Sequence, residues 1–471
     1  MSMLGAVLMP HPPVLLPEVG RGRESEIAAT ERAMRAAAEA VAHWAPDVLV
    51  VASPHTVMYS DYFHISPGKS ARGDMSAFGA PQLQVETEYD AQLREEIIRL
   101  ARDSRLEAGT LGQRGEELDH GTLIPLYYLR RAGVSCPIVR VGLSGFSPLE
   151  HYRLGRCAAR AVEKLGRRAV FVASGDLSHK LRADGPYGFA PEGPAFDEAV
   201  TGAMASGDFL SFLAIEPSLC ERAAECGLRA FQMMSGALDG LAVAPELLSH
   251  EGPFGVGYAV ALFPVTGRDE GRRFEAAYER VMSERADARR SGEDAWVRLA
   301  RLSLETYVRT GRSLDTLPDG LPAELTGRAA GAFVSLHAGG RLRGCIGTIS
   351  PVTGSTAAEI VRNGVAAASE DPRFPPVRPD ELDALSYSVD VLFTPMPVES
   401  IDQLDPARYG VIVTKGWKRG LLLPNLDGVD SAQQQVDIAK RKAGIDLFDD
   451  DVELERFEVV RHERGGEPRR G

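Results

Sequence analysis

Three short apolar runs in the first 180 residues each end in a loop that carries a histidine. Continuous apolar runs of this kind predict strands buried on both faces, as in a parallel sheet. Because ligands bind beyond the carboxyl ends of the strands in open α/β sheets, the pattern predicts one shared site at that edge. The runs are Gly5–Met9, Val48–Ala52 and Ala169–Ala173, and the histidines that follow them are His11, His55 and His179.

Segments with helical spacing of apolar residues separate these runs. Ser25–Trp44 is alanine-rich with apolar residues near one face, and Ser25 is its predicted N-cap. Ser147–Leu165 begins with serine followed by proline, a typical helix start. Strands that alternate with helices predict an α/β unit with right-handed crossovers.

Two further sequence positions are candidates for the same edge. Asp119 precedes His120 at the start of a predicted helix, and it is either the N-cap of that helix or the carboxylate that orients the His120 ring. His250 and Glu251 precede the last predicted strand of this region, at about 257–263. Because successive residues of an extended chain face opposite sides, only one of these two is expected to reach the site.

The second half of the chain begins after a charged segment. Residues 267–294 are dominated by Arg, Glu, Asp and Ala, which predicts a partly helical linker between a unit at 1–266 and a second unit at 295–465. In the second unit, Gly331–His337 and Arg341–Ile349 flank a Gly-Gly turn and predict a hairpin. Further strands interleaved with helices predict a smaller α+β unit.

Composition narrows the class of protein. A hydrophobic content of 44% and a charged content of 25% are typical of soluble globular proteins, and the net charge of −13 argues against a general nucleic-acid binder. Five scattered cysteines without a C-x-x-C pair indicate neither a zinc knot nor a disulfide framework. Without a predicted membrane span or signal peptide, a cytoplasmic protein is expected. Nothing in the sequence excludes an oligomer.

The candidate residues suggest metal chemistry. Two neutral imidazoles and one carboxylate on one face of a metal form the facial triad of non-haem Fe(II) oxygenases. Additional histidines near such a metal can act as general acid or base, because their ordinary pKa lies near neutrality. Spacing alone does not establish the triad, since its members come from separate strands.

Four sequence blocks resemble the LigB-type subunit of class III extradiol ring-cleavage dioxygenases, whose fold the Memo-like proteins share. They are Met9–Pro13, Ser53–His55, Leu118–Thr122 and Ser174–His179. The resemblance implies that His11, His55 and Glu251 bind Fe(II) or another divalent metal. It also implies that His179 is the acid/base, that His120 lines the pocket, and that a catechol-like aromatic substrate reacts with O2.

The Memo-like branch leaves a second function open. Its members keep the fold without an established ring-cleaving role, so a metal-binding or scaffold protein is the alternative to a dioxygenase. The carboxylate at Glu251 favours the dioxygenase-like site over the thiol-containing Memo-like site.

The second unit resembles the AMME-syndrome candidate-region (AMMECR) proteins, on the motif Leu342–Gly347 supported by Gly331–Val334, Glu370–Phe374 and Arg419–Pro424. Within the motif, Cys345 is either a nucleophilic or redox thiol or a small buried residue between glycines that permit a tight backbone. Arg343 is a candidate anion contact. The combination of both units resembles the fused form of the AmmeMemoRadiSam system, which implies a radical-SAM protein as partner.

Overall fold

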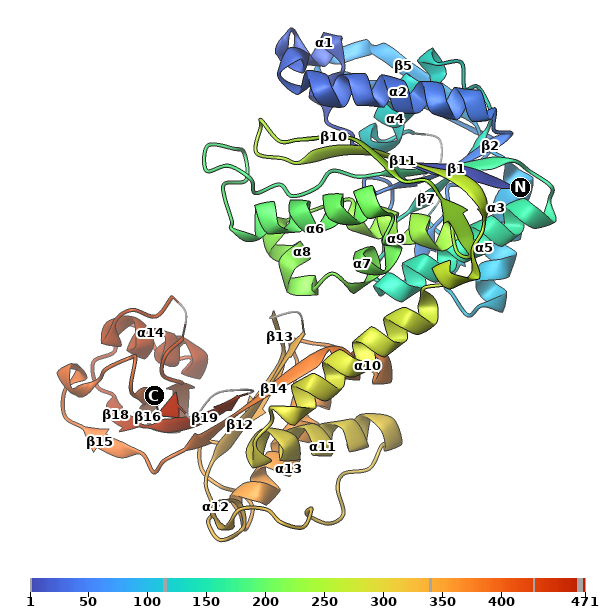
Figure 1. Cartoon of the computed structure of the whole chain (residues 1–471). Helices are drawn as coiled ribbons and strands as arrows, with labels where there is room; N and C mark the ends of the chain where they lie inside the picture. Colours follow the sequence, from blue (N-terminus) through green and yellow to red (C-terminus); the bar gives the residue numbers. More distant parts are fainter. Residues whose placement is uncertain (1, 113–116, 339–340, 427, 464–468, 471) are drawn as a thin grey trace. The chain divides into compact units, whose positions relative to one another are not determined.

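The chain divides into two compact units, Met1–Val281 and Met282–Gly471 (Figure 1). The computed structural model describes residues 2–112, 117–338, 341–426, 428–463 and 469–470. The boundary between the units lies within the charged segment 267–294, and most of that segment is the helix α10, Glu275–Ser291.

A seven-stranded sheet forms the centre of the first unit, in the order β10-β11-β1-β8-β2-β7 with β9 paired to β11. Neighbours among β1, β8, β2 and β7 are parallel, whereas β11 runs antiparallel to β1 and β10. The predicted α/β class with a mostly parallel sheet is therefore confirmed. The strands are β1 Met3–Met9, β2 Val48–Ser53, β7 Ile138–Gly142, β8 Ala169–Ser174, β9 Leu241–Val243, β10 Glu246–Glu251 and β11 Tyr258–Arg268.

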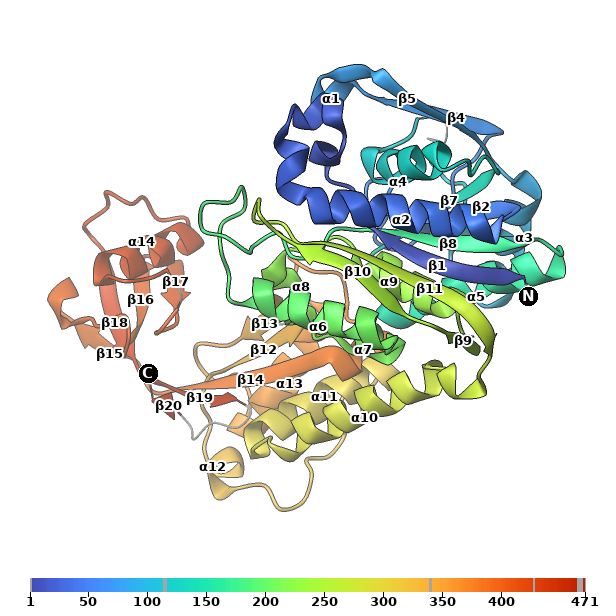
Figure 2. The ribbon, with the colours of Figure 1, turned by 45° about the horizontal axis from the view of Figure 1, so that its top comes forward.

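Helices cover both faces of this sheet (Figure 2). Along β1, Val7 and Met9 pack in the core that contains α2 and α4, whereas Ala6 and Leu8 pack in the core that contains α5 and α9. Burial on both faces explains why the run is continuously apolar. The helices are α1 Pro17–Gly20, α2 Ala28–Trp44, α3 Ala91–Asp103, α4 His120–Arg131, α5 Pro148–Lys164, α6 Glu192–Ser206, α7 Phe209–Ala214, α8 Pro217–Ala223 and α9 Leu228–Ala237.

Short strands outside the main sheet complete the first unit. Two pairs form, β3 with β6 in parallel and β4 with β5 antiparallel. Their bounds are β3 Phe63–His64, β4 Ser70–Met75, β5 Ala80–Glu88 and β6 Ala108–Gly109.

The first residues of three helices show whether the predicted N-cap residues are correct. The predicted N-cap role of Ser147 at the start of α5 is confirmed, and Glu150 completes a capping box with it. The side chain of Asp119 accepts from the backbone N–H of Thr122 at 2.9 Å, so its N-cap role at α4 is also confirmed. The predicted cap at Ser25 is wrong, because α2 begins at Ala28 after a short 3-10 turn and the Ser25 hydroxyl donates to the carbonyl of Gly22.

The second unit contains two antiparallel sheets, β13-β12-β14-β19-β20 and β15-β18-β16-β17. The predicted hairpin is confirmed as β12 and β13, and its turn residues Gly339 and Gly340 lie outside the described residues. The strands are β12 Ala332–Ala338, β13 Arg341–Gly347, β14 Leu385–Leu392, β15 Met396–Val398, β16 Gly410–Lys415, β17 Lys418–Leu422, β18 Glu453–Phe457, β19 Val459–Glu463 and β20 Arg469–Arg470.

Different helices pack on the two sheets of the second unit. Helices α11 and α13 pack on the five-stranded sheet, and α14 packs on the four-stranded sheet. The helices are α11 Ala295–Thr310, α12 Ala323–Thr326, α13 Thr356–Ser369 and α14 Ala432–Ala443. In the described part of the chain, no helix is long and apolar enough to cross a membrane.

The middle of α10 is the expected site of proteolysis. Arg280, Ser283 and Glu284 are exposed there, and a helix with so few buried apolar side chains can open locally. Brief trypsin treatment of the native protein should therefore cleave the chain within residues 280–290 and give two stable fragments. Mass spectrometry of the fragments locates the cleavage site. First cleavage elsewhere in residues 1–265, or one resistant core, would contradict independent folding of the two units.

Candidate metal centre

Three neighbouring parallel strands deliver the histidines to one edge of the sheet. In the order β1-β8-β2, Met9 pairs with Ser174 and Ala173 pairs with Ala52, so the carboxyl ends of the strands lie level. His11 follows β1 by two residues and His55 follows β2 by two residues. The loop after β8 carries Asp176 and His179 to the same edge.

His11 is buried, and its hydrogen bonds fix the tautomer of the ring. Nδ1 lies 2.9 Å from the hydroxyl oxygen of Ser174, and that hydroxyl donates its only hydrogen to the carbonyl of Gly121 at 2.5 Å. Nδ1 must therefore be the donor, which leaves the lone pair of Nε2 directed into the site. Burial, followed by the nearby His55, lowers the pKa of His11 to about 3, so the ring is neutral near pH 7.

His55 faces this lone pair. Its Nε2 lies 2.9 Å from Nε2 of His11, and the two rings meet edge to face with centroids 4.7 Å apart. Two ring nitrogens at this distance have a hydrogen atom or a cation between them. The contact is a hydrogen bond here, and the same two nitrogens could also bind one metal ion.

The third donor beside the pair is the thiol of Cys226, which lies just before α9. Its Sγ is 3.8 Å from Nε2 of His11, and the ligand atoms of His11, His55 and Cys226 all lie within 4.8 Å of one another. Burial raises the pKa of Cys226 well above its usual value. A bound metal would act in the opposite direction, because a coordinating thiol loses its proton.

Asp176 adds a carboxylate next to the same group. Its Oδ2 lies 3.8 Å from Nε2 of His11, and its Oδ1 accepts from the His11 backbone N–H at 2.9 Å. Burial raises the pKa of Asp176 to about 6. Asp176 also forms a second possible ligand group with His179 and Cys226.

Glu251, the predicted third ligand, lies elsewhere in the structure. Its Oε1 accepts from the backbone N–H of Thr30 at 2.6 Å and from the Thr30 hydroxyl at 2.7 Å. Thr30 is the third residue of α2, so Glu251 caps the helix start that was predicted to be capped by Ser25. A carboxylate is favoured there because free N–H groups and the helix dipole attract negative charge. Among the described residues, the group of possible ligand atoms at the two histidines contains Cys226, and Glu251 is not part of it.

The cap assignment makes a specific prediction. Glu251→Ala should bind as much metal as the wild type but lose about 1–2 kcal/mol of unfolding free energy, because it leaves the N–H and hydroxyl of buried Thr30 without their acceptor. Elemental analysis and urea unfolding measure the two effects. Ser25→Ala is the matched control and should change neither the metal content nor the unfolding free energy. Loss of metal in Glu251→Ala would show that Glu251 is a metal ligand after all.

His179 and His120 complete the edge. Nε2 of His179 is buried without a hydrogen-bond partner among the described residues, and its ring stacks on Tyr187 with centroids 5.1 Å apart. The ring of His120 lies 4.1 Å from that of His55 and 5.3 Å from that of Phe78. Burial lowers the pKa of both histidines, that of His120 to about 4. All four predicted histidines therefore gather at one site.

In the described part of the chain, the carboxylate of Asp119 bonds to groups other than the ring of His120. It accepts hydrogen bonds from the hydroxyl of Ser53 at 2.6 Å and from the hydroxyl of Thr122. It also forms an ion pair with the buried guanidinium of Arg140. These bonds join the end of β2 to the start of α4. The carboxylate therefore positions the two elements that carry His55 and His120.

The two candidate residues of the second unit have structural partners. Arg343 makes a bidentate ion pair with Glu381, at 2.7 and 3.0 Å, so the predicted anion contact does not fit. Burial raises the pKa of Cys345, which leaves a protonated thiol near pH 7. A Cβ on Gly344 would lie 2.3 Å from the carbonyl oxygen of Ala367, which supports the tight-backbone interpretation of the flanking glycines.

Cys226 and Asp176 were missed in the sequence. Asp176 stands inside the Ser174–His179 block without a distinguishing pattern, and Cys226 is one of five scattered cysteines. The only local signal at Cys226 is its neighbour Gly227, because a glycine lets the backbone next to the cysteine lie close to another segment of the chain. A Cβ on Gly175 would lie 2.2 Å from the Cα of Gly227.

Comparisons with known families confirm both resemblances. Residues 5–261 match the catalytic LigB subunit of aromatic ring-opening dioxygenase, and residues 297–462 match AMMECR1. A protein of Clostridium acetobutylicum is 39% identical over 469 residues, which cover 98% of this chain and 99% of that protein. The fusion of the two regions is therefore shared with that protein.

Other relatives match parts of the chain. A Thermotoga maritima protein is 54% identical over 173 residues, which cover 36% of this chain and 98% of that protein. The crystal structure of an uncharacterized Pyrococcus horikoshii protein is 31% identical and covers 38% of this chain and 96% of that one, with a TM-score of 0.34. That of an uncharacterized Escherichia coli K12 protein is 17% identical and covers 55% of this chain and 99% of that one, with a TM-score of 0.35.

Proposed function

Because the chain belongs to the family of the catalytic LigB subunit of aromatic ring-opening dioxygenases, we propose that its first unit is a metal-dependent oxidoreductase that opens a catechol-like ring with O2. The observation that carries the proposal is the pair of imidazole Nε2 atoms 2.9 Å apart, with a thiol beside them and with His179 at the same edge. We propose Fe(II) as the metal.

The donor set fits a transition metal. Imidazole nitrogens suit iron, zinc and copper, and a thiolate is a soft donor that binds the same group of metals. His11, His55 and Cys226 would hold the ion, with the carboxylate of Asp176 next to it. Fe(II), when bound, supplies the one-electron chemistry through which O2 reacts with an organic substrate.

The protein's own residues would bind the substrate and move its protons. His179 is neutral near pH 7, because burial lowers its pKa, and its Nε2 has no hydrogen-bond partner among the described residues, so it can take the proton of a phenolic hydroxyl and later return it. Aromatic groups border the site, with Phe78 against His120 and Tyr187 against His179. Phe78 and Tyr187 are 38% and 58% exposed, so their faces are available to an aromatic ring.

One observation favours a second candidate function. Cys226 stands where a facial triad has its carboxylate, and a thiol near iron and O2 is itself open to oxidation. The second candidate is therefore a metal-binding or scaffold protein without ring cleavage, which acts with a radical-SAM partner in a modification pathway.

Anaerobic reconstitution with Fe(II), followed by O2-uptake measurements with a panel of catechols, tests the proposal. We expect iron-dependent O2 uptake with at least one catechol, with one O2 consumed for each ring-opened product. The His55→Ala variant should show no O2 uptake with the same catechol. A fully iron-loaded wild type that consumes no O2 with any catechol would contradict ring cleavage and leave the second candidate.

A further inference from the structure

The second unit contains a cavity of about 660 Å³ on the side of the five-stranded sheet where Cys345 lies. Strands β12, β13, β14, β17 and β19 and helix α14 contribute to its lining. Cavities of about 300–1,000 Å³ are the usual size of small-molecule sites. The motif residues that the metal centre does not use therefore border a space large enough for a ligand.

One side of the cavity is apolar. Leu421, Leu423 and Leu426 line it from the four-stranded sheet and the segment after it, and Leu342 and Ile346 line it from β13. Ligand cavities typically combine such walls with a few polar groups that fix orientation. An apolar part of a ligand would lie against these leucines.

Two of the three lining carboxylates, Asp371 and Asp390, each have an arginine partner, and Glu463 is the third. Asp371 accepts from the guanidinium of Arg373 at 2.9 and 2.7 Å and from the backbone N–H of Cys345 at 2.9 Å. Asp390 makes a bidentate pair with Arg461 at 2.8 and 3.0 Å. The charges of Asp371 and Asp390 are therefore balanced by Arg373 and Arg461.

Lys442 is the lining cation that is not part of these two ion pairs. It lines the cavity from α14, and it makes no hydrogen bond or ion pair with the residues that the structure describes. Partial desolvation lowers the pKa of Lys442. Lys442 is solvent-exposed, and Nη1 of Arg373 makes no hydrogen bond within the described chain, so both offer donors that a ligand acceptor can take over from water.

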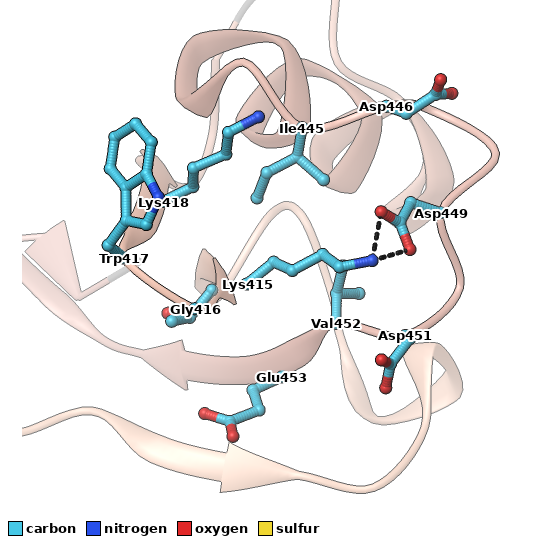
Figure 3. Close-up of a pocket in the computed structure, with 11 residues that line it drawn as sticks. Lys415, Gly416, Trp417, Lys418, Ile445, Asp446, Asp449, Asp451, Val452 and Glu453 are labelled. Atoms are coloured by element: carbon cyan, nitrogen blue, oxygen red, sulfur yellow. Dashed lines mark hydrogen bonds and ion pairs between the residues drawn. The ribbon is translucent and has the colours of Figure 1, made fainter.

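Another hollow of this unit is lined mainly by acidic residues and by lysines that already have partners (Figure 3). Its two lysines are engaged, Lys415 with Asp449 and Lys418 with the carbonyl of Gly444. Asp446 and Asp451 add further acceptors to its lining. An anion is therefore expected to bind at Lys442 and not in this hollow.

We propose that the cavity beside Cys345 binds a small molecule that has one anionic oxygen group on an apolar body, with Lys442 as the contact for the anionic group. A carboxylate and a phosphate monoester share this chemistry. Arg373 and Arg461 shape the polar side through their fixed pairs, and the leucines take the apolar part.

The Cys345 thiol provides a readout that does not require a known reaction. It lines the cavity and accepts the hydroxyl hydrogen of Ser335 at 3.2 Å. A molecule in the cavity would cover the thiol and slow its alkylation by neutral iodoacetamide. The other four cysteines lie outside the cavity lining and serve as internal references.

The test measures alkylation of each cysteine in the full chain by mass spectrometry, with hexanoate, hexyl phosphate, hexanol or inorganic phosphate present. We expect hexanoate or hexyl phosphate to protect Cys345 alone and saturably, and the better of the two identifies the anionic group. Hexanol and inorganic phosphate should protect at least about tenfold less well, since each lacks one of the two parts.

Variants of α14 test the contact itself. Lys442→Gln should raise the concentration for half-protection about tenfold or more, whereas Lys442→Arg and the neighbouring Arg441→Gln should stay within about threefold of the wild type. Arg441 is exposed and its side chain bonds only within its own helix in the described chain. Equal protection in Lys442→Gln, equal protection by hexanol, or no protection by either anion would overturn the proposal.

Discussion

Cys226→Ala should bind the metal at least about 100-fold more weakly than the wild type. The reason is that Sγ of Cys226 is the third donor beside the two imidazoles, and even residues that only support metal ligands are worth about 10–100-fold in affinity. Competition with a chromophoric chelator, followed by elemental analysis, measures the change. The loss should exceed any effect of Glu251→Ala on metal content.

Cys220→Ala is the matched control for this variant. Cys220 lies in the neighbouring helix α8, and its thiol donates to the carbonyl of Glu216, the N-cap residue of that helix. It should keep full metal content. Unchanged affinity in Cys226→Ala would show that the ion is held by the histidines with another donor, of which Asp176 is the nearest carboxylate.

The second large effect is expected for His179→Gln. With a substrate that supports O2 uptake, this variant should keep its metal but lose about 10²–10⁴-fold in turnover, the usual contribution of a general acid or base. Glutamine can still form hydrogen bonds but cannot take up a proton. Steady-state O2 uptake and metal content, measured on the same preparation, give both quantities.

The metal content of His179→Gln distinguishes two roles. His179 also forms a ligand group with Asp176 and Cys226, so loss of metal together with turnover would make it a ligand. Tyr187→Phe preserves the ring that stacks on His179 and should change turnover little. A His179→Gln variant with undiminished turnover would contradict the acid/base role.

Features with local causes were predictable from the sequence. Apolar runs such as 48–52 specify buried parallel strands, and the end of such a strand fixes where His55 lies. The N-cap at Ser147, followed by Pro148 at the first helical position, is likewise a signal between adjacent residues. These rules led to the correct edge of the sheet and to its four histidines.

The remaining site residues depend on contacts that no local pattern encodes. Glu251 and Thr30 are 221 positions apart, and the choice between capping a helix and binding a metal depends on which element lies opposite the end of β10. Cys226 and His11 are 215 positions apart for the same reason. Arg343 looked free in the sequence because Glu381, its partner, lies in a different element.

The central claim is that a thiol belongs to the metal centre, and X-ray absorption spectroscopy of the Zn²⁺-loaded full chain tests it most directly. A thiolate ligand gives a sulfur scatterer at about 2.3 Å, apart from imidazole nitrogens at about 2.0–2.1 Å. We predict one sulfur and at least two nitrogens in the wild type, and no sulfur in Cys226→Ala. A wild-type spectrum with nitrogen and oxygen scatterers alone would contradict the account and point back to a carboxylate as the third ligand.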